Sequence, residues 1–113
     1  MVNLVIVSHS ARLAEGVAEL AAQMGGDAVA IEPAGGLDDG SIGTDAERVR
    51  AAVERVRSPD GVLVLMDLGS ALMSAEIALE MIEDAGGPVT LSPAPLVEGA
   101  VAAATSESAA RSR

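Results

Sequence analysis

The sequence predicts an α/β fold: an open parallel sheet of four strands in the order 2-1-3-4, with helices on both faces. Short apolar runs alternate along the chain with stretches in which apolar residues recur every three or four positions. Glycine and proline separate these segments. Half of the 113 residues are hydrophobic, which is enough for one domain with one core.

The first quarter of the chain predicts a strand, a helix and a second strand. Val2–Val7 is a nearly continuous apolar run, typical of a strand that is buried on both faces. Ser10–Met24 has the apolar spacing of one helix face, and Gly25 and Gly26 end that helix. Ala28–Glu32 is predicted to be the second strand.

A loop and a second helix follow. Residues 33–43 contain four glycines, too many for a helix or a strand, and a loop of this length is often functional. Thr44 is predicted to cap the helix, with Glu47 three positions later completing a capping box. The apolar stripe of this helix ends at Val56.

The second half of the chain repeats the alternation. Val62–Met66 is a buried strand, and a third helix then runs through Asp84. Val89–Leu91 is a brief fourth strand. Pro95 opens a last helix through Ala104, and the small polar residues 105–113 are predicted to form a flexible tail.

The composition argues against several classes of function. A net charge of −10, with seven arginines and no lysine, repels phosphate backbones, so no nucleic-acid partner is expected. The absence of aromatic residues removes any stacking surface for a flavin or a base. With no cysteine and one histidine, we expect neither a metal nor a cofactor. No signal peptide and no apolar stretch of about 18 residues is visible, so we expect a cytoplasmic protein without membrane contact.

Two polar side chains are predicted to meet in one crevice. In open α/β sheets, ligands bind beyond the carboxyl ends of the strands where the strand order reverses, here between the first and third strands. His9 follows the first of these strands and Asp67 the other. Adjacent strands lie about 4.8 Å apart, so the two side chains can form a hydrogen bond. A carboxylate that accepts one ring N–H leaves the other nitrogen as a nucleophile and stabilises the imidazolium that forms on attack.

Phosphorus is the predicted electrophile for this nucleophile. Both residues precede helices, whose N-termini offer unpaired N–H groups and partial positive charge. The glycine-rich loop is expected to add further N–H donors. Ser10, Thr44, Gly69 and Ser70 are the predicted phosphate-binding residues. Asp67, taken alone, would equally suit a helix N-cap.

A resemblance to a known family covers most of the chain. The sequence resembles the IIA-type phosphotransferase (M) subunit of dihydroxyacetone kinase, a relative of the mannose-class IIA proteins of the bacterial sugar phosphotransferase system. The similarity lies in the segments VIVSHSARLAEGVAELAAQM, GGLDDGSIGTDAERV, LVLMDLGSALMSAEIALE and APLVEGAVAAA. It implies a mannose-IIA-like fold, with residues 1–104 as the IIA-like phosphotransferase domain and 105–113 as the tail.

The resemblance also implies a role for the domain. His9 matches the phosphorylated histidine of the family, and Asp67 matches the carboxylate that orients it. The phosphoryl group would come from phosphoenolpyruvate through enzyme I and an HPr-like carrier. It would pass to ADP bound on the L subunit, and the ATP formed would phosphorylate dihydroxyacetone held on the K subunit. A homodimer is expected.

The sequence is also compatible with two alternative functions. A mannose-class sugar-uptake component would use the same histidine but transfer its phosphate to a sugar-specific IIB protein. A non-catalytic flavodoxin-like binding module would use no phosphohistidine. An aspartyl-phosphate receiver would need an acidic cluster after the first strand and a late lysine, and this chain has neither.

Overall fold

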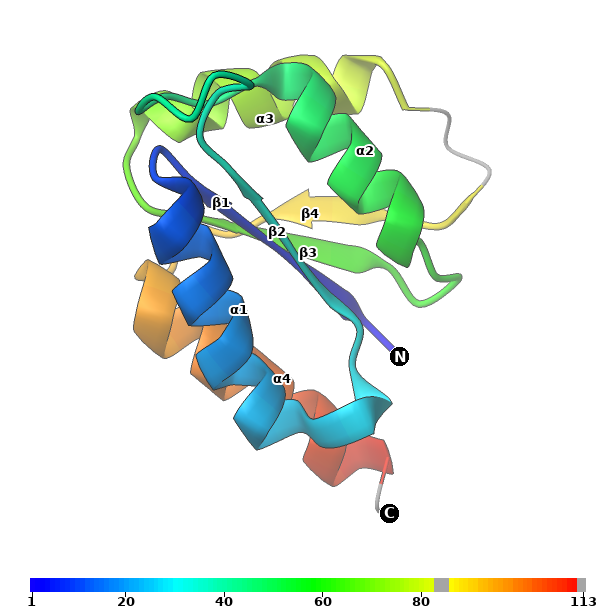
Figure 1. The fold of residues 1–113 in the computed structure, drawn as a ribbon. Coiled ribbons are helices and arrows are strands. Elements are labelled where there is room, and N and C mark those ends of the chain that lie inside the picture. Colours follow the sequence, from blue (N-terminus) through cyan, green and yellow to red (C-terminus); the bar gives the residue numbers. More distant parts are fainter. Residues whose placement is uncertain (83–85, 112–113) are drawn as a thin grey trace.

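The computed structural model describes residues 1–82 and 86–111. The four strands form one parallel sheet in the order β2-β1-β3-β4, which confirms the predicted topology (Figure 1). The elements are β1 (Asn3–Ser8), α1 (Ala11–Gly25), a 3-10 turn (Gly26–Ala28), β2 (Ile31–Gly35), α2 (Ala46–Val56), β3 (Val62–Met66), α3 (Ser70–Glu80), β4 (Val89–Leu91) and α4 (Leu96–Arg111).

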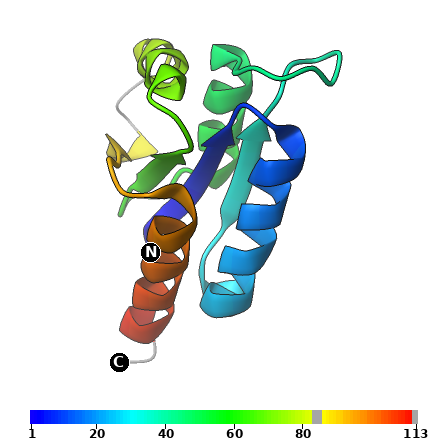
Figure 2. The same cartoon turned by 90° about the vertical axis from the view of Figure 1, so that its left-hand side faces the viewer.

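The continuous apolar run of β1 follows from its central position in the sheet. Leu4 and Ile6 pack against α1 and α4 on one face, whereas Val5 and Val7 pack against α2 and α3 on the other. All four side chains are fully buried. Because successive strand residues point to opposite faces, a strand covered by helices on both sides needs apolar residues at every position. Figure 2 shows α1 and α4 side by side below the other two helices.

The second strand lies three residues later than predicted. Residues 26–28 form the 3-10 turn, and β2 contains Pro33 opposite Ile6 of β1. The four glycines of residues 33–43 predict a loop there, but β2 extends into that range as far as Gly35. Proline cannot donate a backbone hydrogen bond, but Pro33 is tolerated because β2 pairs only with β1 in the described part of the chain, and a missing N–H on the outer side of an edge strand costs nothing.

The predicted cap of the second helix was wrong by one residue. Asp45 is the N-cap of α2, and its Oδ1 accepts the N–H of Glu47 at 3.0 Å. An aspartate is at least as good an N-cap as a threonine, so Asp45, the residue after Thr44, caps the helix instead. The Thr44 hydroxyl instead lies 2.7 Å from Ser74 Oγ of α3.

The last two helices also end elsewhere than expected. Helix α3 ends at Glu80, and the predicted end at Asp84 lies outside the described residues. Helix α4 continues past Ala104, its predicted end, to Arg111. Thus residues 105–111, predicted to be a flexible tail, extend the helix. No glycine or proline interrupts this stretch, and alanine favours its continuation.

A glycine on the exposed surface of α1 offers a test of the helix. Gly16 lies within α1, and a Cβ added there would meet no heavy atom within 4 Å. Glycine weakens a helix interior because its backbone loses more entropy on folding. We expect Gly16→Ala to raise the free energy of unfolding by about 0.5–1 kcal/mol, measured by urea denaturation.

Gly35→Ala is the matched control, since the same substitution is made where space is lacking. Its new Cβ would lie 2.7 Å from the Ser10 carbonyl oxygen and 2.9 Å from Ala14 Cβ, where the end of β2 approaches α1. We expect this variant to be less stable than the parent chain. A loss of stability in Gly16→Ala would contradict the explanation for α1.

Candidate functional site

His9 and Asp67 lie together at the carboxyl ends of the two central strands. Val7 of β1 is paired with Met66 of β3, and the Asp67 N–H donates to the Val7 carbonyl at 3.1 Å. The next residues are thereby brought side by side, and His9 Nδ1 lies 3.0 Å from Asp67 Oδ1. The predicted contact between these two side chains is confirmed.

The Asp67 carboxylate accepts hydrogen bonds from four groups. Oδ1 is reached by His9 Nδ1 and by the Leu68 N–H at 2.7 Å. Oδ2 is reached by the Ser8 hydroxyl at 2.9 Å and the His9 N–H at 3.0 Å. Burial of this side chain, which is only 12% exposed, raises its pKa, but the hydrogen bonds outweigh burial and hold the pKa of Asp67 below its ordinary value of 3.8. Asp67 is therefore ionised at neutral pH.

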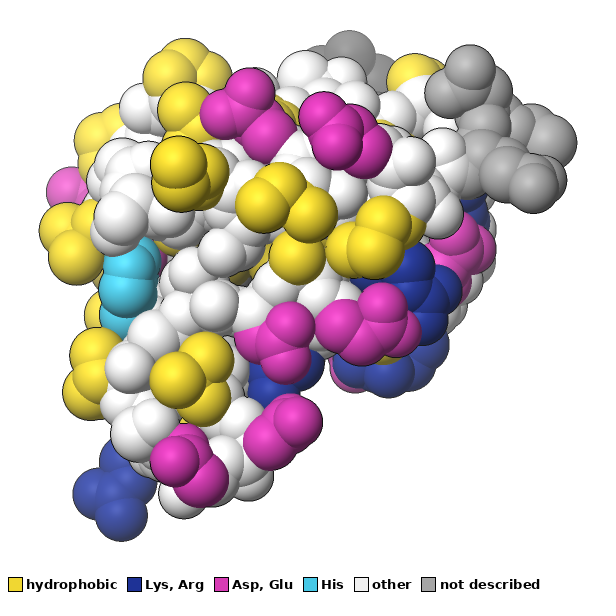
Figure 3. All heavy atoms as spheres, turned by 90° about the horizontal axis from the view of Figure 1, so that it is seen from above, with side chains coloured by type: hydrophobic (Ala, Val, Ile, Leu, Met, Phe, Trp, Pro, Cys, Tyr) yellow, Lys and Arg dark blue, Asp and Glu magenta, His cyan; other side chains and the backbone are white. Residues whose placement is uncertain are grey.

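An ionised Asp67 decides the roles of the two ring nitrogens. A carboxylate can only accept, so the hydrogen bond to Oδ1 requires a proton on His9 Nδ1. When the ring is neutral, Nε2 then carries the free electron pair. Ser70 Oγ, at the first position of α3, lies 2.7 Å from Nε2 and donates to it in this tautomer. The His9 side chain is 19% exposed, and Figure 3 shows the single histidine at the surface.

The predicted phosphate-binding residues differ in their hydrogen-bond partners. Gly69 directly precedes α3, and the N–H groups of a first helical turn lack partners within their own helix. The Ser10 hydroxyl caps α1 by accepting the Leu13 N–H at 3.2 Å. The Thr44 hydroxyl is engaged with Ser74. The structure thus brings Ser70 into direct contact with the ring, while the hydroxyls of Ser10 and Thr44 have other partners.

The glycine-rich loop holds the backbone of the histidine. The Gly43 N–H donates to the His9 carbonyl at 2.8 Å. Within the loop, Leu37 N–H donates to the Ser41 carbonyl and Gly40 N–H to the Leu37 carbonyl. These three N–H groups close the loop on itself and on His9. The expectation that the loop supplies phosphate donors stays a prediction for its other N–H groups.

Sequence reasoning missed one buried polar residue of the site. Ser8 is fully buried at the end of β1, donates to Asp67 and accepts the Ser10 N–H at 3.0 Å. The available signal was a serine that directly follows the apolar run Leu4–Val7 and precedes the only histidine of the sequence. By itself that pattern is equally typical of a strand end.

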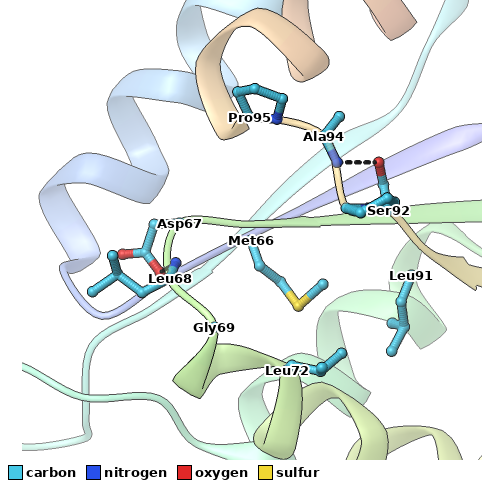
Figure 4. A pocket seen from close by; sticks show the side chains of 10 residues that line it. Met66, Asp67, Leu68, Gly69, Leu72, Leu91, Ser92, Ala94 and Pro95 are labelled. Atoms are coloured by element: carbon cyan, nitrogen blue, oxygen red, sulfur yellow. Dashed lines mark hydrogen bonds between the residues drawn. The ribbon is translucent and has the colours of Figure 1, made fainter.

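A cavity of about 560 Å³ lies beside Asp67 (Figure 4). It is bounded by Asp67–Gly69 and Leu72 on one side and by Leu91–Pro95 on the other, and most of these residues are apolar. Among residues 1–82 and 86–111, no three His, Asp or Glu side chains are placed to hold a metal ion. Across the same residues, no helix is long and apolar enough to cross a membrane.

The chain with this fold belongs to a known class of proteins. The chain is a member of the family described as the PTS system fructose IIA component, which matches residues 3–113. Within that family it belongs with the phosphoryl donor subunits named DhaM, as its similarity to curated proteins shows.

Two of these relatives differ greatly in length. The phosphoryl donor subunit DhaM of the PEP-dependent dihydroxyacetone kinase of Escherichia coli K12 is 56% identical over 110 residues. That match covers 94% of this chain but only 23% of the relative, so the chain spans about a quarter of that protein. The DhaM of dihydroxyacetone kinase 2 from Listeria innocua is 39% identical, and the match covers 92% of this chain and 84% of the relative.

A solved structure has the same fold. The crystal structure of the protein of unknown function EF1359 superposes with a TM-score of 0.83 at 34% sequence identity. The match covers 96% of this chain and 85% of that one.

Proposed function

We propose that this chain is the phosphohistidine carrier of a dihydroxyacetone kinase. In this proposal Nε2 of His9 accepts a phosphoryl group from an HPr-like carrier, charged by phosphoenolpyruvate and enzyme I in the cytoplasm. The group then passes to ADP on the L subunit, and the ATP formed phosphorylates dihydroxyacetone on the K subunit. The observation that supports this best is the ionised Asp67 on Nδ1, which leaves Nε2 as the nucleophile near the surface.

The transfer step forms one bond to phosphorus and breaks one bond to phosphorus. The electron pair of His9 Nε2 forms a bond to phosphorus, while the bond from phosphorus to the nitrogen of the donor breaks and its electron pair returns to the donor ring. Nδ1 keeps its proton, so the phosphorylated ring carries a positive charge next to the Asp67 carboxylate. The carboxylate stabilises that charge, and the ring remains a good leaving group for transfer to ADP.

Ser70 has two successive tasks in this mechanism. Its hydroxyl donates to Nε2 before the reaction and must leave that position when phosphorus arrives. It then lies within reach of a phosphoryl oxygen, as do the N–H groups of Gly69 and Ser70 at the start of α3. Donors placed where charge collects stabilise the transition state of phosphoryl transfer.

The surface around the histidine fits protein partners. Three large apolar side chains next to the site are exposed: Leu13 on α1, Ile42 in the glycine-rich loop and Leu68 after β3. Figure 3 shows hydrophobic side chains on both sides of the histidine. Exposed apolar patches of this kind mark interaction sites.

We also propose that the chain forms a homodimer. The exposed large apolar residues in this region are Leu72, Met73 and Ile77 of α3 and Met81 directly after it. Among the residues that the structure describes, β4 pairs only with β3. An exposed apolar helix face next to an open sheet edge is suited to contact with a second copy.

The mass of the intact chain tests the proposed function. After incubation with phosphoenolpyruvate, enzyme I and HPr, we expect the chain to gain one acid-labile phosphate. Adding the ADP-loaded L subunit should remove that phosphate and form ATP. Native mass spectrometry of the same sample reports whether two copies associate. No gain in mass would contradict the carrier function, and transfer to a sugar-specific IIB protein instead of ADP would assign the chain to sugar uptake.

A further inference from the structure

The structure leads us to propose that Ser8 is a positioning residue for phosphoryl transfer. It acts through Asp67 and selects Nε2, rather than Nδ1, as the phosphate-accepting atom of His9. This inference rests on the proposed function, because it assigns the atom on which that function depends.

Ser8 has a hydroxyl where the strand itself requires none. Its side chain is fully buried at the last position of β1, opposite Gly35 of β2. A polar group in such a place is unfavourable unless it is hydrogen-bonded. Its oxygen accepts the Ser10 N–H at 3.0 Å, and its O–H is directed at Asp67 Oδ2 at 2.9 Å. The hydroxyl is thus held from one side and donates on the other.

The two bonds at each oxygen fix the plane of the Asp67 carboxylate. Oδ2 is held by Ser8 and the His9 N–H, and Oδ1 then faces His9 Nδ1 and the Leu68 N–H. If the Ser8 hydroxyl is removed, Oδ2 keeps a single donor among these four groups. The carboxylate can then rotate, and the alignment between Oδ1 and Nδ1 weakens.

The contact between Ser70 and His9 does not select the histidine tautomer. A hydroxyl both donates and accepts, so Ser70 can bond equally well to Nε2 with or without its proton. Only the carboxylate distinguishes the two tautomers, because it accepts and never donates while ionised. The choice of tautomer therefore depends on Asp67 and on the groups that orient it.

Ser58 provides a matched control at the other end of the sheet. Its hydroxyl also accepts the N–H two residues ahead, from Asp60 at 3.1 Å, and donates to the Met1 carbonyl at 2.6 Å. Ser58→Ala removes the same kind of turn and the same number of hydrogen bonds. It leaves Asp67 and His9 untouched.

The tautomer of His9 can be measured directly by long-range ¹H–¹⁵N NMR at pH 8. We expect the parent chain and Ser58→Ala to have the proton on Nδ1, and Ser8→Ala to show a substantial population with the proton on Nε2. The single-turnover rate of phosphorylation should fall about 10-fold in Ser8→Ala, since loss of the orienting carboxylate itself costs up to about 10⁴-fold in a related arrangement. Ser58→Ala should keep the parent rate.

A purely structural role for Ser8 would give a different result. If Ser8→Ala keeps the parent tautomer and rate while losing only stability, as Ser58→Ala does, the proposal is overturned. Should Ser8→Ala fail to fold, Ser8→Cys retains a weak donor and should show an intermediate tautomer population; a parent-like tautomer there would overturn it. The tautomer is read without any phosphate donor, so failure of the parent chain to become phosphorylated is a separate outcome that contradicts the proposed function alone.

Discussion

His9→Gln is expected to abolish phosphorylation of the chain. His9 is the only histidine, and the sequence contains no lysine or cysteine that could replace it as a nitrogen or sulfur nucleophile. A glutamine amide nitrogen is not nucleophilic, although the side chain can still donate a hydrogen bond toward Asp67. The measurement is the mass of the intact variant after incubation with phosphoenolpyruvate, enzyme I and HPr.

The same variant should remain folded. The His9 side chain is partly exposed at the end of the sheet, and glutamine can still donate a hydrogen bond toward Asp67. A cooperative urea transition close to that of the parent chain is the required control. Phosphate that is still incorporated into folded His9→Gln would exclude His9 as the acceptor.

Asp67→Asn is expected to slow the transfer by about 10²–10⁴-fold. An asparagine cannot satisfy the four donors that the carboxylate now accepts, because its NH₂ group must face two of them. If the NH₂ group faces Nδ1, the proton moves to Nε2 and the nucleophile is lost. If the oxygen faces Nδ1, the ring keeps its tautomer but loses the neighbouring negative charge. Single-turnover phosphorylation kinetics measure the effect.

The loss of stability caused by Asp67→Asn should depend on pH. Hydrogen bonds hold the pKa of Asp67 in the folded chain below 3.8, so the ionised carboxylate stabilises the fold above that pH. This contribution is lost as the pH falls through the lower, folded-state pKa. Relative to the parent chain, the variant should lose about 1–3 kcal/mol of unfolding free energy at pH 7 and less at pH 3. A difference that is constant between the two pH values would contradict this assignment.

Asp45→Asn is the matched control for these experiments. Asp45 is also a carboxylate that accepts a backbone N–H, but it caps α2 and makes no hydrogen bond to His9. Asparagine is about as good an N-cap as aspartate. We expect this variant to keep the parent stability and the parent rate. A slow Asp45→Asn variant would show that general loss of negative charge, rather than the contact with His9, limits transfer.

The sheet and the central contact could be predicted because they depend on repeating, local signals. Val5 and Val7 point to one face of β1 and Leu4 and Ile6 to the other, so an uninterrupted apolar run predicts a strand between two helical layers. Parallel strands end at the same edge of the sheet. The residues that follow β1 and β3 therefore had to meet, whatever the details of the loops.

The element boundaries required the tertiary structure. The four glycines of residues 33–43 predict a loop, but β2 continues through Pro33, which is tolerated because β2 is an edge strand among the residues that the structure describes. The last helix continues beyond Ala104, and there the Glu107 carboxylate accepts the Val2 N–H at 3.3 Å, a contact between the two ends of the chain. Local residues permit the longer helix, since no glycine or proline interrupts residues 105–111, but the contact between Glu107 and Val2 cannot be recognised from residues three or four positions away.

The sequence by itself determined the strand order, the two-sided burial of β1 and the meeting of His9 with Asp67. Only the tertiary structure decided that Ser8 donates to Asp67, that Ser70 contacts Nε2 and that Thr44 bonds to Ser74 instead of capping α2. The physical reason is the directionality of hydrogen bonds. Hydrophobic periodicity indicates which face of an element is buried. The partner of a hydroxyl depends instead on distances and angles between segments that are 30 to 61 residues apart in the chain.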